Sequence, residues 1–540
     1  MDEPYILILG AGLMQRPAIE AARELGFRTL VVDANPNALC VPFADRFEPV
    51  DLKDKDALVA LAKSMGKNLA AVFTAGTDFS ASVSYVAEKC GLNAHSYEAA
   101  LNASNKVRMR SCFERDGISS PKFQKVHRTQ IASLIAPEVI GSMSFPKVVK
   151  PVDNMGARGC RLIRNRDEFL PAVEDAVRFS RTGCAILEDY MEGPEFSIDS
   201  IVYDGTLTIT GFADRHIFYE PYFIENGHTM PTSVSDEMKS ALIKTFAQGI
   251  KSLGLTSGVA KADIKYTANG PMIGEIAARL SGGYMSGWTY PYASGINLTK
   301  EAMLIALGKK PETLLAQRKK LPIDGAPFEI YDLPCVKNSA ERAWISIPGK
   351  VSEIVGLERG RERPFVKNTF TRSGVSSIVD FPRNNVEKCG NFISLSEKKE
   401  LAVESAENAV SDVVLRLEPD CAETDRFLAG ECQKSEQNFP PDAFELDEKL
   451  RAELEQSASK MGVIGAGEKV AKKIPICMEK SADNLKDWNH RSIRKTLDLF
   501  DEICPEHPEM DALQFWKILV RGGIQGILYY SDGVSHKDRW

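Results

Sequence analysis

A segment near the middle of the chain, residues 257–283 (SGVAKADIKYTANGPMIGEIAARLSGG), constrains the fold most strongly. Its two apolar runs, 259–266 and 272–277, flank a turn of small and polar residues, which predicts an antiparallel hairpin. We expect a three-residue loop, 268–270, with Gly270 in a left-handed conformation. The length of that loop sets which residues of the two strands pair.

Asp263 and Glu275 lie opposite each other across this predicted hairpin. In the three-residue register both carboxylates share one face, whereas a two-residue loop at Asn269-Gly270 would put them on opposite faces. Paired carboxylates repel unless a cation lies between them, and hard oxygen ligands suit a Mg²⁺ ion that bridges phosphates. The hairpin therefore predicts a metal-nucleotide site, and a charged, solvated hairpin is the alternative.

The first hundred residues alternate short apolar runs with helical patterns, which is the order of βαβ units in a parallel sheet covered by helices. Gly10-Ala11-Gly12 follows the first run, but Gln15 stands where a dinucleotide-binding turn needs its third glycine. We therefore favour a glycine-rich turn that shapes a small-molecule or domain interface over an NAD site.

A second glycine-rich loop, 153–159, lies between a strand that carries Lys150 and a strand at 161–163. Backbone N–H groups of such a loop can surround phosphate oxygens while the lysine adds positive charge, and an ordinary hairpin turn is the alternative. Residues 185–199 then read as a strand, an acidic connector and a second strand. A connector of this kind can hold an adenine edge and ribose hydroxyls.

The ordered set of these motifs resembles the ATP-grasp superfamily across residues 1–420. The set is Lys106, the VVKP strand, the glycine loop, LEDYMEGPEFSID, the ADR at 213–215 and EIAARLSGG. Within the superfamily it is most similar to carboxylate-amine ligases of the L-amino-acid ligase type, and more distantly to biotin carboxylase and carbamoyl-phosphate synthetase.

The resemblance implies a multidomain α/β and α+β chain with an ATP-grasp fold, preceded by a Rossmann-like pre-ATP-grasp domain. Beyond residue 421 it stops, and amphipathic patterns at 492–504 and 510–527 predict a packed, mainly helical appendage. Oligomerisation, a second substrate or another enzyme all remain open as its role. The expected domains are 1–100 (pre-ATP-grasp), 101–310 (ATP-grasp, with a small lobe at 110–187 and a large lobe at 188–310), 311–420 (C-terminal lobe) and 421–540 (appendage).

The resemblance also implies roles for individual residues. Asp263 and Glu275 match the metal ligands, while Arg279, Arg215 and His228 match residues that act on the acyl and phosphoryl groups. For His228 the alternative is a structural brace of its Gly-Pro loop. The residues that match ATP contacts are Lys106, Lys150, Gly156, Ala157, Arg158, Gly159, Glu188, Asp189, Met191 and Glu195.

One position departs from the pattern of the superfamily. Its metal motif often reads Glu-x-Asn-x-Arg, and here Ala277 replaces the asparagine. Water could complete the coordination of a second ion, metal affinity could fall, or activity could be lost. We expect the first, because Mg²⁺ commonly retains waters.

The activity that the resemblance implies is ligation of a small carboxylate, such as an amino acid, to an amine. The expected cofactors are ATP and two Mg²⁺ ions, with Mn²⁺ as a substitute, and an acyl-phosphate intermediate would release ADP and phosphate. Two alternatives remain: an enzyme that uses bicarbonate, and a nonenzymatic ATP-binding regulator.

Composition narrows the partners and the location. A net charge of -7, from 67 basic and 74 acidic residues, argues against a nucleic-acid partner. The eleven cysteines are scattered without a CxxC pair, which suits a reducing compartment. The apolar run after the N-terminus is too short for a signal peptide or a membrane span. We expect a cytoplasmic protein with small-molecule substrates, no membrane partner and possible homodimerisation.

Overall fold

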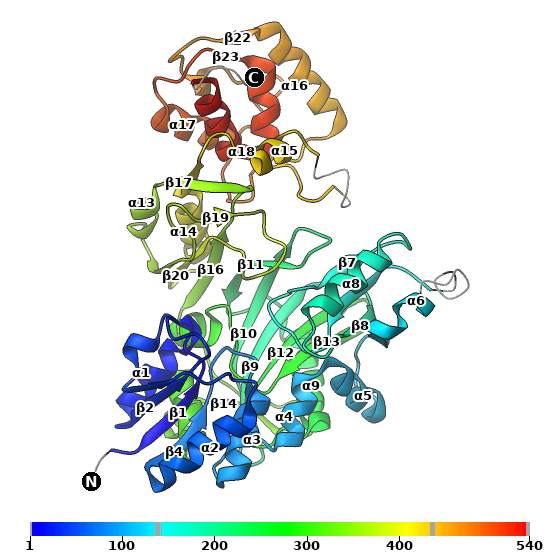
Figure 1. Ribbon diagram of the computed structural model, residues 1–540, viewed down its shortest axis with the longest axis vertical. Coiled ribbons are helices and arrows are strands. Elements are labelled where there is room, and N and C mark those ends of the chain that lie inside the picture. Colours follow the sequence, from blue (N-terminus) through cyan, green and yellow to red (C-terminus); the bar gives the residue numbers. More distant parts are fainter. Residues whose placement is uncertain (1–2, 135–140, 142, 432–437, 536–540) are drawn as a thin grey trace. The chain divides into compact units, whose positions relative to one another are not determined.

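The computed structural model describes residues 3–134, 141, 143–431 and 438–535 (Figure 1). The predicted appendage therefore includes two short stretches, 432–437 and 536–540, outside the described residues. The chain forms two compact units. The first comprises Met1–His216, His228–Ala340 and Leu395–Lys399, and the second comprises Ile217–Gly227, Glu341–Ser394 and Glu400–Trp540. The chain passes between them within β10 (Thr206–Phe218), β11 (Ile224–Met230), β16 (Asn338–Trp344) and β20 (Gly390–Ser396), and at the start of α14 (Lys399–Asp412).

The first unit opens with a four-stranded sheet in the order β3-β2-β1-β4, in which every pairing is parallel. One of its two middle strands, β1, is buried on both faces: Ile6 and Ile8 share a hydrophobic cluster with α1 and with the later helix 298–306, while Leu7 and Leu9 share one with α2 and α3. The predicted α/β start of the chain is confirmed. The elements are β1 (Tyr5–Leu9), β2 (Arg28–Val32), β3 (Arg46–Glu48), β4 (Leu69–Phe73), α1 (Arg16–Glu24), α2 (Lys55–Met65) and α3 (Ser80–Cys90).

Gln15, at the position of the missing third glycine, bonds within this domain. Its Oε1 accepts a hydrogen bond of 2.9 Å from the backbone N–H of Ala75, and its Nε2 donates to the carbonyl of the same residue. Asp33, at the end of β2, accepts from the N–H of Ala11 at 2.9 Å. The side chain of Gln15 therefore links the turn after β1 to the segment after β4.

A second sheet of the first unit has the order β5-β8-β6-β7 and is antiparallel throughout. The helix α8 lies beside this sheet (Figure 1) and packs on it through Phe169, Ala172, Val173 and Ala176. The sheet carries Lys150 on β6 and Glu188 on β8. The elements are β5 (Phe123–His127), β6 (Lys147–Pro151), β7 (Arg161–Ile163), β8 (Cys184–Asp189), α4 (Tyr97–Ser104), α5 (Lys106–Asp116), α6 (Ile131–Leu134) and α8 (Phe169–Phe179).

The largest sheet of the first unit includes the order β13-β12-β9-β10. One face is apolar and packs on α9, where Gly249 permits a close approach, because a Cβ atom there would lie 2.6 Å from Ile276 Cδ1. The opposite face carries the predicted carboxylates. The elements are β9 (Glu195–Tyr203), β10 (Thr206–Phe218), β12 (Gly258–Thr267), β13 (Gly270–Ala277), β14 (Lys319–Lys320), β15 (Glu329–Asp332), α9 (Asp236–Leu253), α10 (Tyr290–Ser294), α11 (Leu298–Ala306) and α12 (Glu312–Gln317).

The second unit joins the predicted C-terminal lobe and appendage in one hydrophobic core. Arg491 contributes to this union, since its Nε donates to the carbonyl of Ser411 at 2.9 Å and its Nη1 pairs with Asp487 at 3.1 Å. The elements are β17 (Gly349–Val355), β18 (Val366–Thr371), β19 (Ile378–Val379), β20 (Gly390–Ser396), β21 (Val414–Leu417), β22 (Val463–Ile464), β23 (Met510–Asp511), α13 (Leu357–Arg361), α14 (Lys399–Asp412), α15 (Ala422–Leu428), α16 (Glu448–Met461), α17 (Ile493–Ile503) and α18 (Ala512–Ser535).

The mainly helical character of the appendage is confirmed by α15 to α18. Among the helices in the described part of the chain, none has the length and hydropathy that crossing a bilayer requires.

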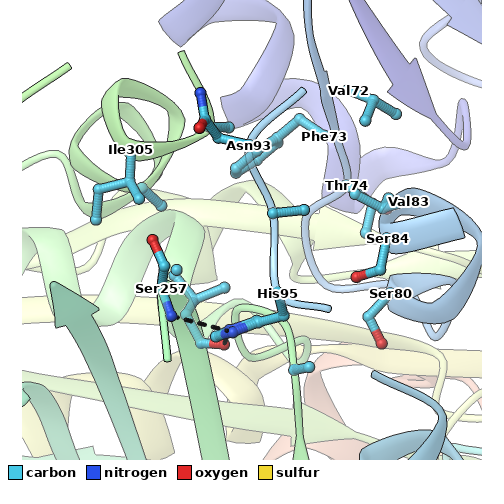
Figure 2. Close-up of a pocket in the computed structure, with 16 residues that line it drawn as sticks. Val72, Phe73, Thr74, Ser80, Val83, Ser84, Asn93, His95, Ser257 and Ile305 are labelled. Atoms are coloured by element: carbon cyan, nitrogen blue, oxygen red, sulfur yellow. Dashed lines mark hydrogen bonds between the residues drawn. The ribbon is translucent and has the colours of Figure 1, made fainter. Parts of the chain in front are cut away.

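A cavity of about 60 Å³ lies in the first unit, among β4, α3, the segment 93–95, the start of β12 and α11. Figure 2 shows the ring of His95 at its edge. The Nε2 of His95 lies 2.9 Å from the carbonyl of Val259, and its Nδ1 lies 3.4 Å from the N–H of Ser257. Donation from Nε2 and acceptance at Nδ1 describe a neutral imidazole, and burial lowers the pKa of His95 to about 4.

The low pKa of His95 predicts a pH dependence of stability. Its contribution is fully present above the ordinary pKa of about 6.5 and is lost as pH falls toward 4, because the unfolded state then binds the proton more tightly. The full loss is roughly 3 kcal/mol, at about 1.4 kcal/mol per pKa unit. Urea unfolding of the wild type and of His95→Gln, between pH 7.5 and pH 4.5, measures the difference. Parallel pH profiles for the two proteins would contradict the prediction.

Candidate functional site

The hairpin of β12 and β13 places Asp263 directly opposite Glu275, which confirms the predicted pairing on one face. The predicted three-residue loop is wrong. Thr267 pairs with Gly270, so the loop has two residues, and the register shifts by one residue between Asp263 and Ile264. Without this shift the two-residue loop would put the carboxylates on opposite faces.

Gly274 is the residue at this bulge. A Cβ atom there would lie 3.1 Å from the carbonyl oxygen of Asp263, which is a tight approach to backbone. Its own carbonyl accepts a hydrogen bond of 2.5 Å from Nη2 of Arg110, on α5. A glycine and a buried arginine thus hold the register that brings the carboxylates together.

Arg110 also belongs to a buried ion-pair group, whose central residue is Glu188. Its Nε lies 2.7 Å from Oε1 of Glu188, and Nζ of Lys150 lies 2.5 Å from Oε2 of the same carboxylate. Arg110 and Glu188 are almost completely buried. Burial raises the pKa of Glu188, but the charges of Arg110 and Lys150 outweigh it and hold that pKa below its ordinary value. Glu188 therefore stays ionised and fixes the ammonium of Lys150.

Lys106, the first residue of α5, connects the glycine loop to the hairpin. Its Nζ donates to the carbonyl of Asn154 at 3.0 Å and lies 3.4 Å from Oε2 of Glu275. Burial raises the pKa of Glu275, but Lys106, Lys261 and Lys150 outweigh it, and the pKa falls to about 2. Burial lowers the pKa of Lys106, and Glu275 reverses the effect, so that pKa is raised. Both groups are charged at neutral pH.

Arg215 joins two of the predicted carboxylates. Its Nη1 lies 2.5 Å from Oε1 of Glu195 and 2.8 Å from Oδ1 of Asp263. Lys261 forms an ion pair with the other oxygen of Asp263. On the far side, Nζ of Lys265 lies 3.6 Å from Glu195 and donates to the carbonyl of Met191 at 3.1 Å. Glu195 and Asp263 are therefore each in contact with two cations.

The glycine loop adopts left-handed conformations at Gly156, Ala157 and Gly159, with φ values of 69°, 59° and 68°. Arg158, between them, donates from Nε to the carbonyl of Met155 at 3.1 Å. These backbone conformations turn successive peptide groups in a short space, which is the geometry that phosphate-binding loops use.

The remaining predicted residues lie as follows. Asp189 pairs with Lys147 at 2.5 Å, and His228 is buried in β11. Arg279, just beyond β13, is buried, and its Nε has no hydrogen-bond partner among the described residues. Gly282, in the segment after β13, packs against Gly76: a Cβ atom there would lie 3.3 Å from the carbonyl of Gly76.

Sequence reasoning missed Arg110, Lys261 and Asp199. Lys261 had a readable signal, because it precedes Asp263 by two residues on a strand and so shares its face. Arg110 had a weaker one, since it follows Lys106 by one helical turn. Asp199, on β9, accepts hydrogen bonds from the backbone and hydroxyl of Ser281, and burial raises its pKa to about 6.

The charges on this face fit an anionic ligand and a hard divalent cation. Two carboxylate groups, Asp263 and Glu275, supply oxygen donors on one face, as Mg²⁺ requires. The cations outnumber the carboxylates, and the unpartnered Nε of Arg279 is a donor without an acceptor. A polyphosphate would balance the surplus positive charge. The cations are Lys106, Arg110, Lys150, Arg215, Lys261, Lys265 and Arg279.

A family model described as the ATP-grasp domain matches residues 143–287, from the glycine-loop sheet through the hairpin. This chain contains an ATP-grasp domain. A second model, L-amino acid ligase C-terminal domain 2, matches residues 343–418, in the second unit. The predicted relation to ATP-grasp proteins of the L-amino-acid ligase type is confirmed.

Two curated relatives are distant in sequence and longer than this chain. Carnosine synthase 1 of Gallus gallus is 24% identical over 424 residues, which cover 73% of this chain and 44% of that protein. The large chain of carbamoyl phosphate synthase from Thermus thermophilus is 24% identical over 377 residues, which cover 65% of this chain and 34% of that protein. The ATP-grasp chain thus spans less than half the length of these relatives.

Solved structures support the fold. The L-amino acid ligase of Bacillus licheniformis superposes with a TM-score of 0.64 at 19% identity, covering 77% of this chain and 100% of that one. The phosphoribosylglycinamide synthetase of Anaerococcus prevotii gives a TM-score of 0.58 at 19% identity, with the same coverage. The predicted ATP-grasp fold class is confirmed by these superpositions.

Proposed function

We propose that this ATP-grasp protein is a ligase that joins a small carboxylate, such as an amino acid, to an amine. It would consume ATP, pass through an acyl-phosphate, and release ADP and phosphate. The observation that carries the proposal is the pairing of Asp263 with Glu275 in a group where lysine and arginine side chains outnumber the carboxylates. The names of the ligases among its relatives support the same reaction type.

In the proposed site, Lys106 and Lys150 bind the phosphates of ATP, and the loop 156–159 supplies backbone N–H donors. Glu188 orients Lys150 through the ion pair that also holds Arg110. Asp189 and Met191 would contact the adenine edge, while Glu195 would bind the ribose. Glu188 was expected to contact ATP. Its carboxylate instead forms ion pairs with two cations, Arg110 and Lys150, and so positions Lys150.

Asp263 and Glu275 would hold Mg²⁺, or Mn²⁺ in its place, which when bound neutralises charge on the phosphates. Arg215, held between Glu195 and Asp263, would stabilise the transferring phosphoryl group. Arg279 has a free Nε donor for the oxyanion that forms when the amine attacks the acyl-phosphate. His228 would donate to the phosphoryl oxygens. Because Arg279 and His228 are buried, water that would otherwise hydrolyse the acyl-phosphate is excluded there.

The proposed organisation follows the expected boundaries at residues 100, 310 and 420. We propose a cytoplasmic location, small-molecule substrates and homodimerisation; size-exclusion chromatography with light scattering tests the last of these.

Phosphate release measured with pairs of amino acids and other small carboxylates tests the activity. Lys150→Ala is expected to lower ATP-dependent turnover by at least about 100-fold, because it removes a positioned charge from the phosphates and leaves Glu188 with one partner. Full turnover in this variant would contradict the assignment. Lys122→Ala, also in the first unit but outside the ion-pair group, is the matched control.

The same assay separates the alternatives. ADP release that depends on bicarbonate and not on amino acids would favour a carboxylating enzyme. Nucleotide binding without phosphate release across the whole panel would favour a regulator. The ligase requires that an acid and an amine together stimulate release.

A further inference from the structure

Lys261 lies beside Asp263 and has no role in the proposed reaction. The register pairs Lys261 with Ala277 on β13 and with Asp199 on β9. Its ammonium forms an ion pair with Oδ2 of Asp263, and the residue is only 8% exposed. Because Arg215 holds Oδ1 of Asp263 at 2.8 Å, both oxygens of that carboxylate contact cations of the protein.

Residue 277 does not compete with Lys261 for the position beside Asp263. It stands directly across from Lys261, it is buried, and its methyl group has no atom that can coordinate a metal. Within the described residues, no group of three or more histidine, cysteine, aspartate or glutamate side chains could hold an ion. A second divalent cation would therefore have to displace an ammonium from Asp263 and gain no side-chain ligand from residue 277.

Charge around Lys261 favours keeping the ammonium there. Asp199 lies opposite Lys261 on β9, Asp263 lies two residues along on β12 itself, and Glu275 is a near neighbour whose pKa Lys261 helps to lower. A buried ammonium next to ionised carboxylates is stabilised by their charges and would be costly to move into water. A compact point charge on a flexible stem can also contact a phosphate oxygen.

We propose that the ammonium of Lys261 takes the place of a second divalent cation, so that this site binds one divalent ion with ATP. The inference rests on the proposed function, because it assumes that ATP binds on this face. At Asp263 the site would then combine one exchangeable divalent ion with the ammonium of Lys261, which is part of the chain.

Titration with Mn²⁺ tests the proposal without measuring activity. The free-ion signal in electron paramagnetic resonance is followed with the nonhydrolysable analogue AMP-PNP at saturation and corrected for analogue in solution. We expect close to one bound Mn²⁺ per wild-type chain and close to two for Lys261→Met with Ala277→Asn, because the variant frees one carboxylate oxygen and adds an amide ligand. Lys239→Met, which removes a half-buried lysine from an ion pair with Asp332 outside this group, is the matched control and should remain near one.

Each outcome decides between the proposals. Two ions bound to the wild type would overturn the inference about Lys261 and leave the proposed function standing. One ion in the double variant would overturn it as well, provided that AMP-PNP affinity shows the variant to be folded. Failure of the wild type to bind AMP-PNP would overturn the proposed function and this inference together.

Discussion

Replacement of Glu275 by glutamine is expected to reduce ATP-dependent phosphate release by at least about 100-fold, since it removes a metal-binding charge and leaves the shape unchanged. The pKa of Glu275 is about 2, so the carboxylate is ionised throughout the neutral range and the substitution removes a full charge. Lys106 would lose its ion-pair partner at 3.4 Å and keep only its bond to the loop carbonyl of Asn154.

Single-turnover phosphate release at saturating ATP and Mg²⁺ measures this effect. Glu174→Gln makes the same chemical change on the exposed face of α8 and is expected to preserve turnover within about twofold, as for surface changes away from a site. A Glu275→Gln enzyme with turnover near that of the control would show that the carboxylate is not a metal ligand. Unfolding curves for both variants separate loss of function from loss of fold.

Replacement of Arg110 by methionine is expected to destabilise the first unit by about 3 kcal/mol, the lower end of what removal of one partner of a buried ion pair costs. Glu188, almost completely buried, would retain only Lys150, and the carbonyl of Gly274 would lose its donor. The bulge that sets the register of the hairpin would then lack one of its two supports.

Urea unfolding of the variant and of Arg110→Met with Glu188→Gln measures the loss and its origin. The double variant should recover much of the stability, because no unpaired charge is left in the interior. Arg108→Met, two residues earlier on α5 in an exposed pair with Glu98, should cost less than about 1 kcal/mol. Equal costs for Arg108 and Arg110 would show that burial of the Glu188 pair contributes nothing special.

The fold could be predicted from periodicity where the pattern is long and regular. The parallel start of the chain, the strands around the glycine loop and the two strands of the hairpin all have apolar residues at the positions that the structure buries. Residues 396–417 have a helical pattern throughout, but α14 ends at Asp412 and β21 begins at Val414. The β-branched pair Val413-Val414 favours a strand, and pairing with β17 decides it.

The candidate site was predictable as a set of charged residues, but not as a network. Nothing in the sequence says that Arg110 reaches both Glu188 and the carbonyl of Gly274, because those contacts join segments more than 70 residues apart. The bulge at Gly274 was equally hidden. Loop length alone gives a register, and a single extra residue in one strand reverses which side chains share a face.

Because of the bulge at Gly274, the loop at the tip of the hairpin can change in length. The pairing of Asp263 with Glu275 is fixed at Gly274, and the exposed residues Ala268 and Asn269 lie beyond it. An insertion at the tip would lengthen the loop and leave the strand positions between tip and bulge in step. The tip is therefore the place where a fluorophore or an affinity tag could be inserted to report on nucleotide binding, with the two carboxylates undisturbed.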